Sequence, residues 1–120
     1  MWFNKRIASF KYAFKGLLTL VKTQPNFIIH LFLASIAIAI GFWLQLTAIE
    51  WLVLTFTITL VLFAEAANSA LEFLTDLVSP DYHPLAGKAK DVAAASVLIT
   101  AIGAVIIGLI LFLPKLLAKF

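Results

Sequence analysis

The chain has 120 residues, of which 63% are hydrophobic and only 12% are charged, whereas about 25% are charged in a typical soluble domain. A soluble, two-domain or disordered protein is therefore not expected. The net charge of +3 does not indicate nucleic-acid binding, because the basic residues flank long apolar runs, and the lack of cysteine excludes disulfides, thiolate metal sites and cysteine nucleophiles.

Residues 3–22 predict an amphipathic helix on the membrane surface. Its apolar side chains recur at steps of three and four, and most of its lysines lie off that stripe. A helix packed on the rest of the protein is a compatible alternative. No short apolar core followed by a small-residue cleavage site is present, so we expect no cleaved signal peptide. The apolar stripe consists of Phe3, Ile7, Phe10, Phe14, Leu17, Leu18 and Val21.

Two uncharged stretches, positions 23–49 and 92–114, predict membrane-spanning helices, since each exceeds the roughly 20 residues that a span needs. The segment between them carries acids in an otherwise apolar helical pattern, so it is either a core helix or a third span. Short links on both sides of it favour a third span. The expected fold class is an all-α integral membrane protein, one domain over 1–120, with spans at about 26–47, 50–78 and 88–114.

The distribution of basic residues predicts a cytoplasmic N-terminus. In that orientation seven of the nine lysines and arginines lie inside, and only Lys115 and Lys119 lie outside. Three helices enclose little room for a site, so a homo-oligomer is expected. Small residues at steps of four on the third span fit contact between copies and packing within one chain equally well; these are Ser96, Thr100, Ala104 and Gly108.

Four polar residues of the middle span share one helix face. At about 100° per residue, Glu65, Asn68, Glu72 and Asp76 fall within about 80° of the circumference. At about 1.5 Å per residue, Glu65 lies inside the roughly 30 Å hydrocarbon layer and Asp76 lies beyond it. This stripe begins in the cytoplasmic leaflet and ends in water, which suits a reaction between a lipid head group and a water-soluble reagent.

The chemistry expected of this stripe is phosphoryl transfer, which needs chiefly positioning and charge neutralisation. Glu65, in low-dielectric surroundings, is a better general base than a surface glutamate. Further carboxylates near phosphates suit Mg²⁺, which takes oxygen ligands and keeps some water. Lys90 supplies a point charge for phosphates, although topology alone also explains a lysine there. His30 is expected to be a hydrogen-bonded helix-end residue and not a ligand, and His83 a loop residue.

Two motifs carry a resemblance to a known family. The first is E-A-A-N-S-A-L-E at 65–72 followed by Asp76, and the second is Y-H-P at 82–84 followed by A-K-D-V-A-A at 89–94. Through these motifs the whole chain resembles the prokaryotic diacylglycerol kinase family, which includes undecaprenol kinases. The first span and the F-L-P-K ending at 112–115 resemble the undecaprenol-kinase-like branch more closely.

The resemblance implies a homotrimer of three-span subunits in the bacterial inner membrane, with active sites shared between neighbours. It also implies transfer of the γ-phosphoryl group of MgATP to a membrane lipid hydroxyl. By position, Glu65 resembles the catalytic base, Glu72 a metal ligand, and Asn68 a polar residue of the site. The residues that match nucleotide-binding positions are Lys5, Tyr12, Glu72, Asp76, Asp81, Tyr82, His83, Lys90 and Asp91.

Two positions depart from the family pattern. Gln24 stands where the family usually has a glutamate that is a second metal ligand. Glutamine keeps one oxygen but loses the charge, so weaker magnesium binding is expected. Lys5 stands in place of an arginine, and lysine does not reproduce a planar bidentate contact.

The expected function is therefore an ATP-dependent membrane lipid kinase that acts on diacylglycerol or undecaprenol, with Mg²⁺ as cofactor and no nucleic-acid partner. One alternative is a degenerate, non-catalytic member of the family, which the departure at Gln24 favours. Another is a small ion-coupled transporter, for which intramembrane carboxylates are also typical. The gathering of the acids toward one leaflet argues against the transporter.

Overall fold

A computed structural model describes residues 1–120 as four α-helices without a strand. Of these, α2, α3 and α4 are long and apolar enough to cross a membrane. The structure thus confirms the all-α class and the three apolar helices predicted from the sequence. In chain order the helices are α1 (Trp2–Thr23), α2 (Pro25–Trp43), α3 (Ala48–Val78) and α4 (Pro84–Lys119).

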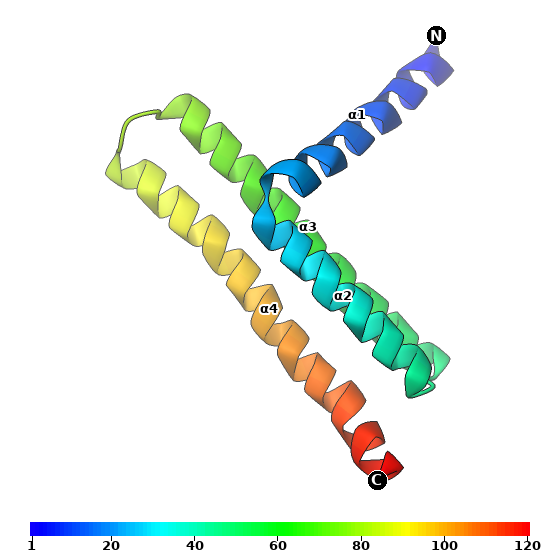
Figure 1. Cartoon of the computed structure of the whole chain (residues 1–120). Coiled ribbons are helices and arrows are strands. Elements are labelled where there is room, and N and C mark those ends of the chain that lie inside the picture. The colour runs from blue at the N-terminus through cyan, green and yellow to red at the C-terminus, as the bar shows by residue number, and fades with distance from the viewer.

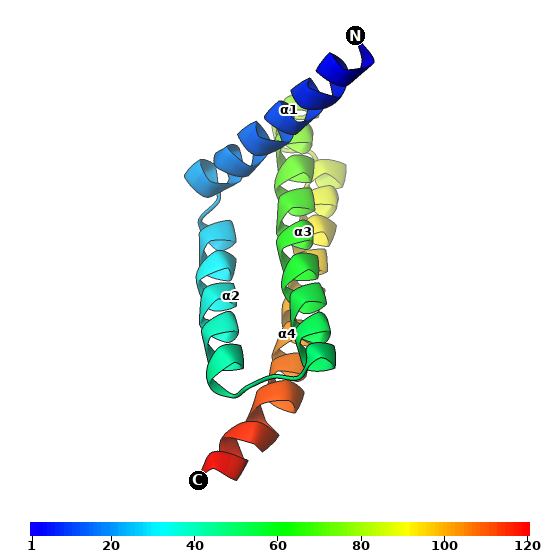
Figure 2. The same cartoon turned by 90° about the vertical axis from the view of Figure 1, so that its right-hand side faces the viewer.

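The three long helices run antiparallel to their chain neighbours, and α3 packs against both α2 and α4 (Figures 1 and 2). From the start of α2, beside the middle part of α3, α1 leaves the bundle at an angle, and the C-terminus lies at the end of the bundle opposite the α3–α4 loop (Figure 1). Only 13 of the 120 residues are buried. Most of the apolar surface of one chain is therefore available to lipid or to further chains.

The turn between α2 and α3 ends α2 at Trp43, earlier than the expected end near 47. Gln45 takes a positive φ of 56°, a conformation that stops a right-handed helix. The backbone N–H of Leu46 then donates to the carbonyl of Gly41 at 3.1 Å. Gly41 is needed at this point because a Cβ there would lie 2.8 Å from the ring of Trp51.

A capping box begins α3 directly after this turn. The Thr47 side chain accepts a hydrogen bond from the backbone N–H of Glu50 at 3.3 Å, and Glu50 Oε2 accepts one from the backbone N–H of Thr47 at 2.9 Å. Both donors lack partners within the helix, so the exchange stabilises its first turn. Glu50 Oε2 also lies 3.1 Å from Lys115 Nζ of α4. We call this region, with Gly41, Thr47, Glu50, Trp51 and Lys115, the turn end.

At the other end of the bundle, α4 begins at Pro84, ahead of the expected start near 88. His83 caps it, since its Nδ1 accepts a hydrogen bond from the backbone N–H of Leu85 at 3.1 Å. Proline is favourable in a first turn, where its missing N–H has no helical partner. The helix then continues through Pro114 to Lys119, as membrane helices tolerate proline.

Candidate active site

The four polar residues predicted to share a face, Glu65, Asn68, Glu72 and Asp76, all lie on the continuous helix α3. We call them the acid face. Their exposure rises along the helix: the Glu65 residue is 2% exposed and Asn68 8%, Glu72 is half-buried, and the Asp76 side chain is 62% exposed. One end of the face is thus enclosed by protein while the other end is open.

Glu65 is the most deeply buried charged residue of the chain. Its Oε2 is buried and has no hydrogen-bond partner. The polar group that approaches it is Nε2 of His30, on α2, at 3.8 Å, which is too long for a hydrogen bond. The carboxylate therefore retains unused capacity to accept a proton or a hydrogen bond.

Asn68 and Glu72 lie one turn apart and contact each other. The Asn68 side-chain amide donates to Glu72 Oε1 at 3.2 Å, which leaves Asn68 Oδ1 buried without a partner. No group of three or more His, Asp or Glu side chains in the chain is arranged to hold a metal ion. The oxygens of Glu72 and Asn68 nevertheless fit Mg²⁺, which is bound through one or two carboxylates with phosphates and water as its other ligands.

Asp76 forms an ion pair with Lys90 of α4. The pair joins the open end of the acid face to the first turns of α4. The structure therefore places Lys90 beside the acid face, where a lysine could contact the phosphates as the sequence analysis expects. Asp91 and the residues of the α3–α4 loop, Asp81, Tyr82 and His83, are exposed beside it. His83 is in addition the helix cap, a role that the sequence analysis did not anticipate.

Three further predicted residues are not joined to the acid face within one chain. Lys5 and Tyr12 lie on α1 and are exposed, and the Tyr12 ring instead faces Lys15 Nζ, 5.6 Å from its centroid. Gln24, in the link between α1 and α2, donates from its amide to Thr23 Oγ1 at 3.2 Å. No hydrogen bond or ion pair connects these residues to α3.

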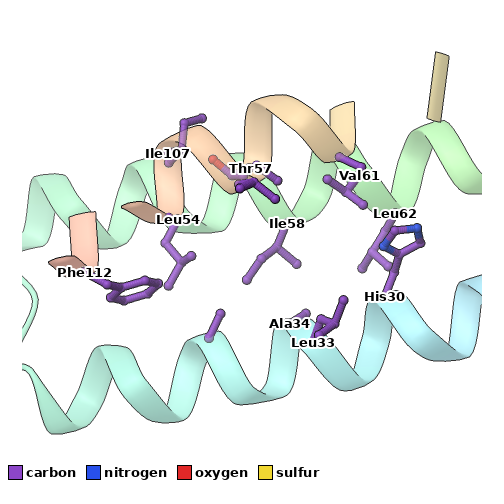
Figure 3. A pocket seen from close by; sticks show the side chains of 15 residues that line it. His30, Leu33, Ala34, Leu54, Thr57, Ile58, Val61, Leu62, Ile107 and Phe112 are labelled. Carbon is purple, nitrogen blue, oxygen red and sulfur yellow. The ribbon is translucent and has the colours of Figure 1, made fainter. Parts of the chain in front are cut away.

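An apolar pocket of about 250 Å³ opens between α2, α3 and α4 and is lined by 15 residues, 12 of them hydrophobic. Figure 3 shows His30 at one end of it and Phe112 at the other. Ala104 and Gly108 of the small-residue stripe line this pocket, so this part of the stripe faces the chain's own helices. The expectation that His30 is a hydrogen-bonded helix-end residue is wrong, because its ring makes no hydrogen bond and lies within α2, 3.8 Å from Glu65 Oε2. The one signal for this contact in the sequence is that His30 is the one titratable side chain of the uncharged stretch 23–49.

Comparison with known proteins decides the family. The family model described as prokaryotic diacylglycerol kinase matches residues 11–112. The chain belongs to the prokaryotic diacylglycerol kinase family. The matched range contains the acid face and the α3–α4 loop, and it leaves out Lys5. The resemblance that the two motifs indicated is thereby confirmed.

Curated relatives of this prokaryotic diacylglycerol kinase family member carry two names. The chain is 38% identical over 113 residues to the undecaprenol kinase of Bacillus subtilis (strain 168), covering 94% of this chain and 92% of that protein. It is 46% identical over 113 residues to the diacylglycerol kinase of Synechocystis sp., covering 93% of this chain and 65% of that protein. It is 36% identical over 109 residues to the diacylglycerol kinase of Escherichia coli (strain K12), covering 91% of this chain and 89% of that protein.

Proposed function

We propose that this chain is a lipid kinase that transfers the γ-phosphoryl group of MgATP to the hydroxyl of a membrane lipid at the cytoplasmic leaflet. The observation that carries the proposal is the rise in exposure along the acid face, from 2% at Glu65 to 62% at the Asp76 side chain. The buried end suits a membrane-embedded alcohol, and the open end suits a nucleotide. Family membership supports a lipid kinase over the ion-coupled transporter.

Glu65 is the proposed general base. It takes the proton of the lipid hydroxyl as the hydroxyl oxygen forms a bond to the γ-phosphorus of ATP. The bond between that phosphorus and the bridging oxygen to the β-phosphate breaks, and ADP leaves with the electron pair. No hydrogen bond occupies the Glu65 side chain, which supports this role, because a carboxylate oxygen is available for the proton.

Glu72 and Asn68 are the proposed protein ligands for Mg²⁺, which neutralises phosphate charge when bound. The hydrogen bond from Asn68 to Glu72 Oε1 orients the carboxylate. Lys90, held beside the face by Asp76, is proposed to bind a phosphate oxygen of ATP. The exposed residues of the α3–α4 loop and Asp91 complete the proposed nucleotide side.

We further propose that the chain acts as a homotrimer in which a neighbouring copy completes the site. The separation of Lys5, Tyr12 and Gln24 from the acid face of their own chain supports shared sites, since these residues are then free to serve a neighbour. The small buried core of a single chain also favours association, because it leaves most apolar side chains uncovered.

The test is phosphorylation of diacylglycerol and of undecaprenol, side by side in mixed micelles, by the purified full chain with MgATP. Product from either lipid is the expected result and names the substrate. No product from either lipid, at any magnesium concentration and also with Gln24→Glu, would contradict the proposed function and leave a non-catalytic member of the family.

Gln24→Glu tests the departure at the metal site separately. If Gln24 lies at a magnesium site, the added carboxylate lowers the Mg²⁺ concentration required for half-maximal activity by about tenfold, since Mg²⁺ prefers charged oxygen ligands. The matched control is Gln45→Glu in the turn end, which leaves the magnesium requirement unchanged. An unchanged requirement in Gln24→Glu removes position 24 from the proposed metal site.

A further inference from the structure

Glu65 is buried at 2% exposure with one carboxylate oxygen unpartnered. An unpaired buried carboxylate is strongly disfavoured, and ionisable residues inside membrane helices almost always have a partner. His30 Nε2 lies 3.8 Å from an oxygen of this carboxylate, Oε2. The contact links α2 to α3, so it depends on the packing of two helices and not on local sequence.

The surroundings of His30 leave its imidazole available for this contact. Its side chain is 19% exposed, and it lies at one end of the apolar pocket, beside Val61 and Leu62 of α3 (Figure 3). The other polar side chain of the pocket, Thr57, is already occupied, because its hydroxyl donates to the carbonyl of Val53 at 2.7 Å. No hydrogen bond of at most 3.5 Å involves the His30 ring.

We propose that His30 is a positioning residue for Glu65, a role that rests on the proposed function. The Nε2–H group of His30 donates to Glu65 Oε2 and fixes the plane of the carboxylate, so that Oε1 is directed at the lipid hydroxyl. An approach of about 0.8 Å converts the observed distance into a hydrogen bond of ordinary length. Such shortening on substrate binding is common, because catalytic hydrogen bonds are often long before substrate binds.

A matched pair of substitutions tests this role. Glutamine at position 30 places an amide N–H close to the position of imidazole Nε2, whereas asparagine is one methylene shorter and does not reach it. We expect His30→Gln to keep kcat within about threefold of the unsubstituted chain and His30→Asn to lower it by about tenfold. KM for ATP and for the lipid stays unchanged in both. Ser35→Ala, whose lost hydroxyl bonds only to Leu31 of its own helix, is the control without effect.

The outcomes of the kinetic comparison separate positioning from a merely structural role. If His30→Gln and His30→Asn have the same kcat, whether high or low, the positioning role is overturned, because the two variants differ in how far the amide reaches toward Glu65. A change confined to KM overturns it as well.

A second measurement does not depend on turnover. Thermal unfolding in detergent is compared for the unsubstituted chain, His30→Leu, Glu65→Gln and the double variant. Since the two side chains interact, the shifts in melting temperature should not be additive; additive shifts would overturn the contact. If the unsubstituted chain phosphorylates neither lipid, the proposed function and the positioning role both fail. If the unsubstituted chain phosphorylates a lipid but the shifts in melting temperature are additive, only the positioning role of His30 is wrong.

Discussion

The two ends of the α3–α4 pair both carry acidic residues, but the side-chain oxygens of these residues have partners at one end and lack them at the other. Each end joins the helices by an ion pair, Glu50 with Lys115 at the turn end and Asp76 with Lys90 at the other end. We call the part of the pair that carries the acid face and Lys90 the acidic end. At the turn end, Glu50 Oε2 accepts a backbone hydrogen bond and also contacts a lysine. At the acidic end, oxygens of Glu65 and Asn68 are buried without partners.

This difference separates acids that stabilise the fold from acids that remain free to react. A carboxylate whose oxygens are occupied contributes to stability and has little capacity left for a substrate. A buried oxygen without a partner destabilises the folded chain unless a ligand contacts it. The comparison therefore predicts losses of activity from substitutions at the acidic end and losses of stability from substitutions at the turn end.

The largest expected effect belongs to Glu65→Gln. Without a general base, lipid phosphorylation should fall by at least about 100-fold, while the melting temperature in detergent stays the same or rises, because a buried charge is removed. Phosphate transfer to lipid and thermal unfolding are measured on the same preparation. Activity within tenfold of the unsubstituted chain would contradict the role of Glu65.

At the turn end, Gly41→Ala should lower the free energy of unfolding by about 1–3 kcal/mol. The added Cβ would lie 2.8 Å from a ring atom of Trp51 and 3.0 Å from Leu46 Cδ1, so neighbouring side chains must shift. Gly16→Ala is the matched control, with no atom within 4 Å of the new Cβ, and it should gain up to about 1 kcal/mol from helix propensity. Equal stability changes in the two variants would show that the α2–α3 turn is not tightly packed.

Lys90→Met tests whether a substitution at the acidic end changes activity without changing stability. Loss of the charge should raise KM for ATP by about tenfold, which is about 1.4 kcal/mol. Stability should change little, because the Lys90 and Asp76 side chains are 43% and 62% exposed and exposed pairs contribute little. Lys88→Met, two residues earlier and exposed, is the control. An unchanged KM in Lys90→Met would remove Lys90 from the nucleotide site.

The smallest effect is expected for Glu50→Gln. Glutamine still completes a capping box, so only the charge opposite Lys115 is lost. Stability should fall by less than about 1 kcal/mol, and kcat should be unchanged. A marked loss of activity would mean that the turn end takes part in the reaction, and the contrast between the two ends would then be wrong.

The sequence predicted the features that depend on one helix at a time. Two long uncharged stretches and the short links around the segment between them predicted the three apolar helices. The 3.6-residue period placed Glu65, Asn68, Glu72 and Asp76 on one face of the middle helix. The end of α2 was less predictable, since the positive φ falls on Gln45 and not on a glycine or asparagine that would have indicated it.

Contacts between helices were harder to predict. The approach of His30 to Glu65 depends on how α2 is rotated against α3, and no spacing within either segment encodes that angle. The same holds for Ala104 and Gly108, which line the pocket within one chain, whereas the sequence left open whether they contact their own chain or another copy. The catalytic, metal-binding and nucleotide-binding roles of all the predicted site residues, Lys5, Tyr12 and Gln24 included, stay predictions.

The helix that carries the acid face contains neither glycine nor proline over its 31 residues, whereas sharp bends in helices occur mainly at such residues. The other two long helices both contain glycine and proline. The axial separation of Glu65 and Asp76, about 16 Å from the helical rise, is therefore set by a stiff backbone. Two reactants that contact opposite ends of this face are held at a fixed spacing, so their own dimensions decide whether their reacting atoms meet.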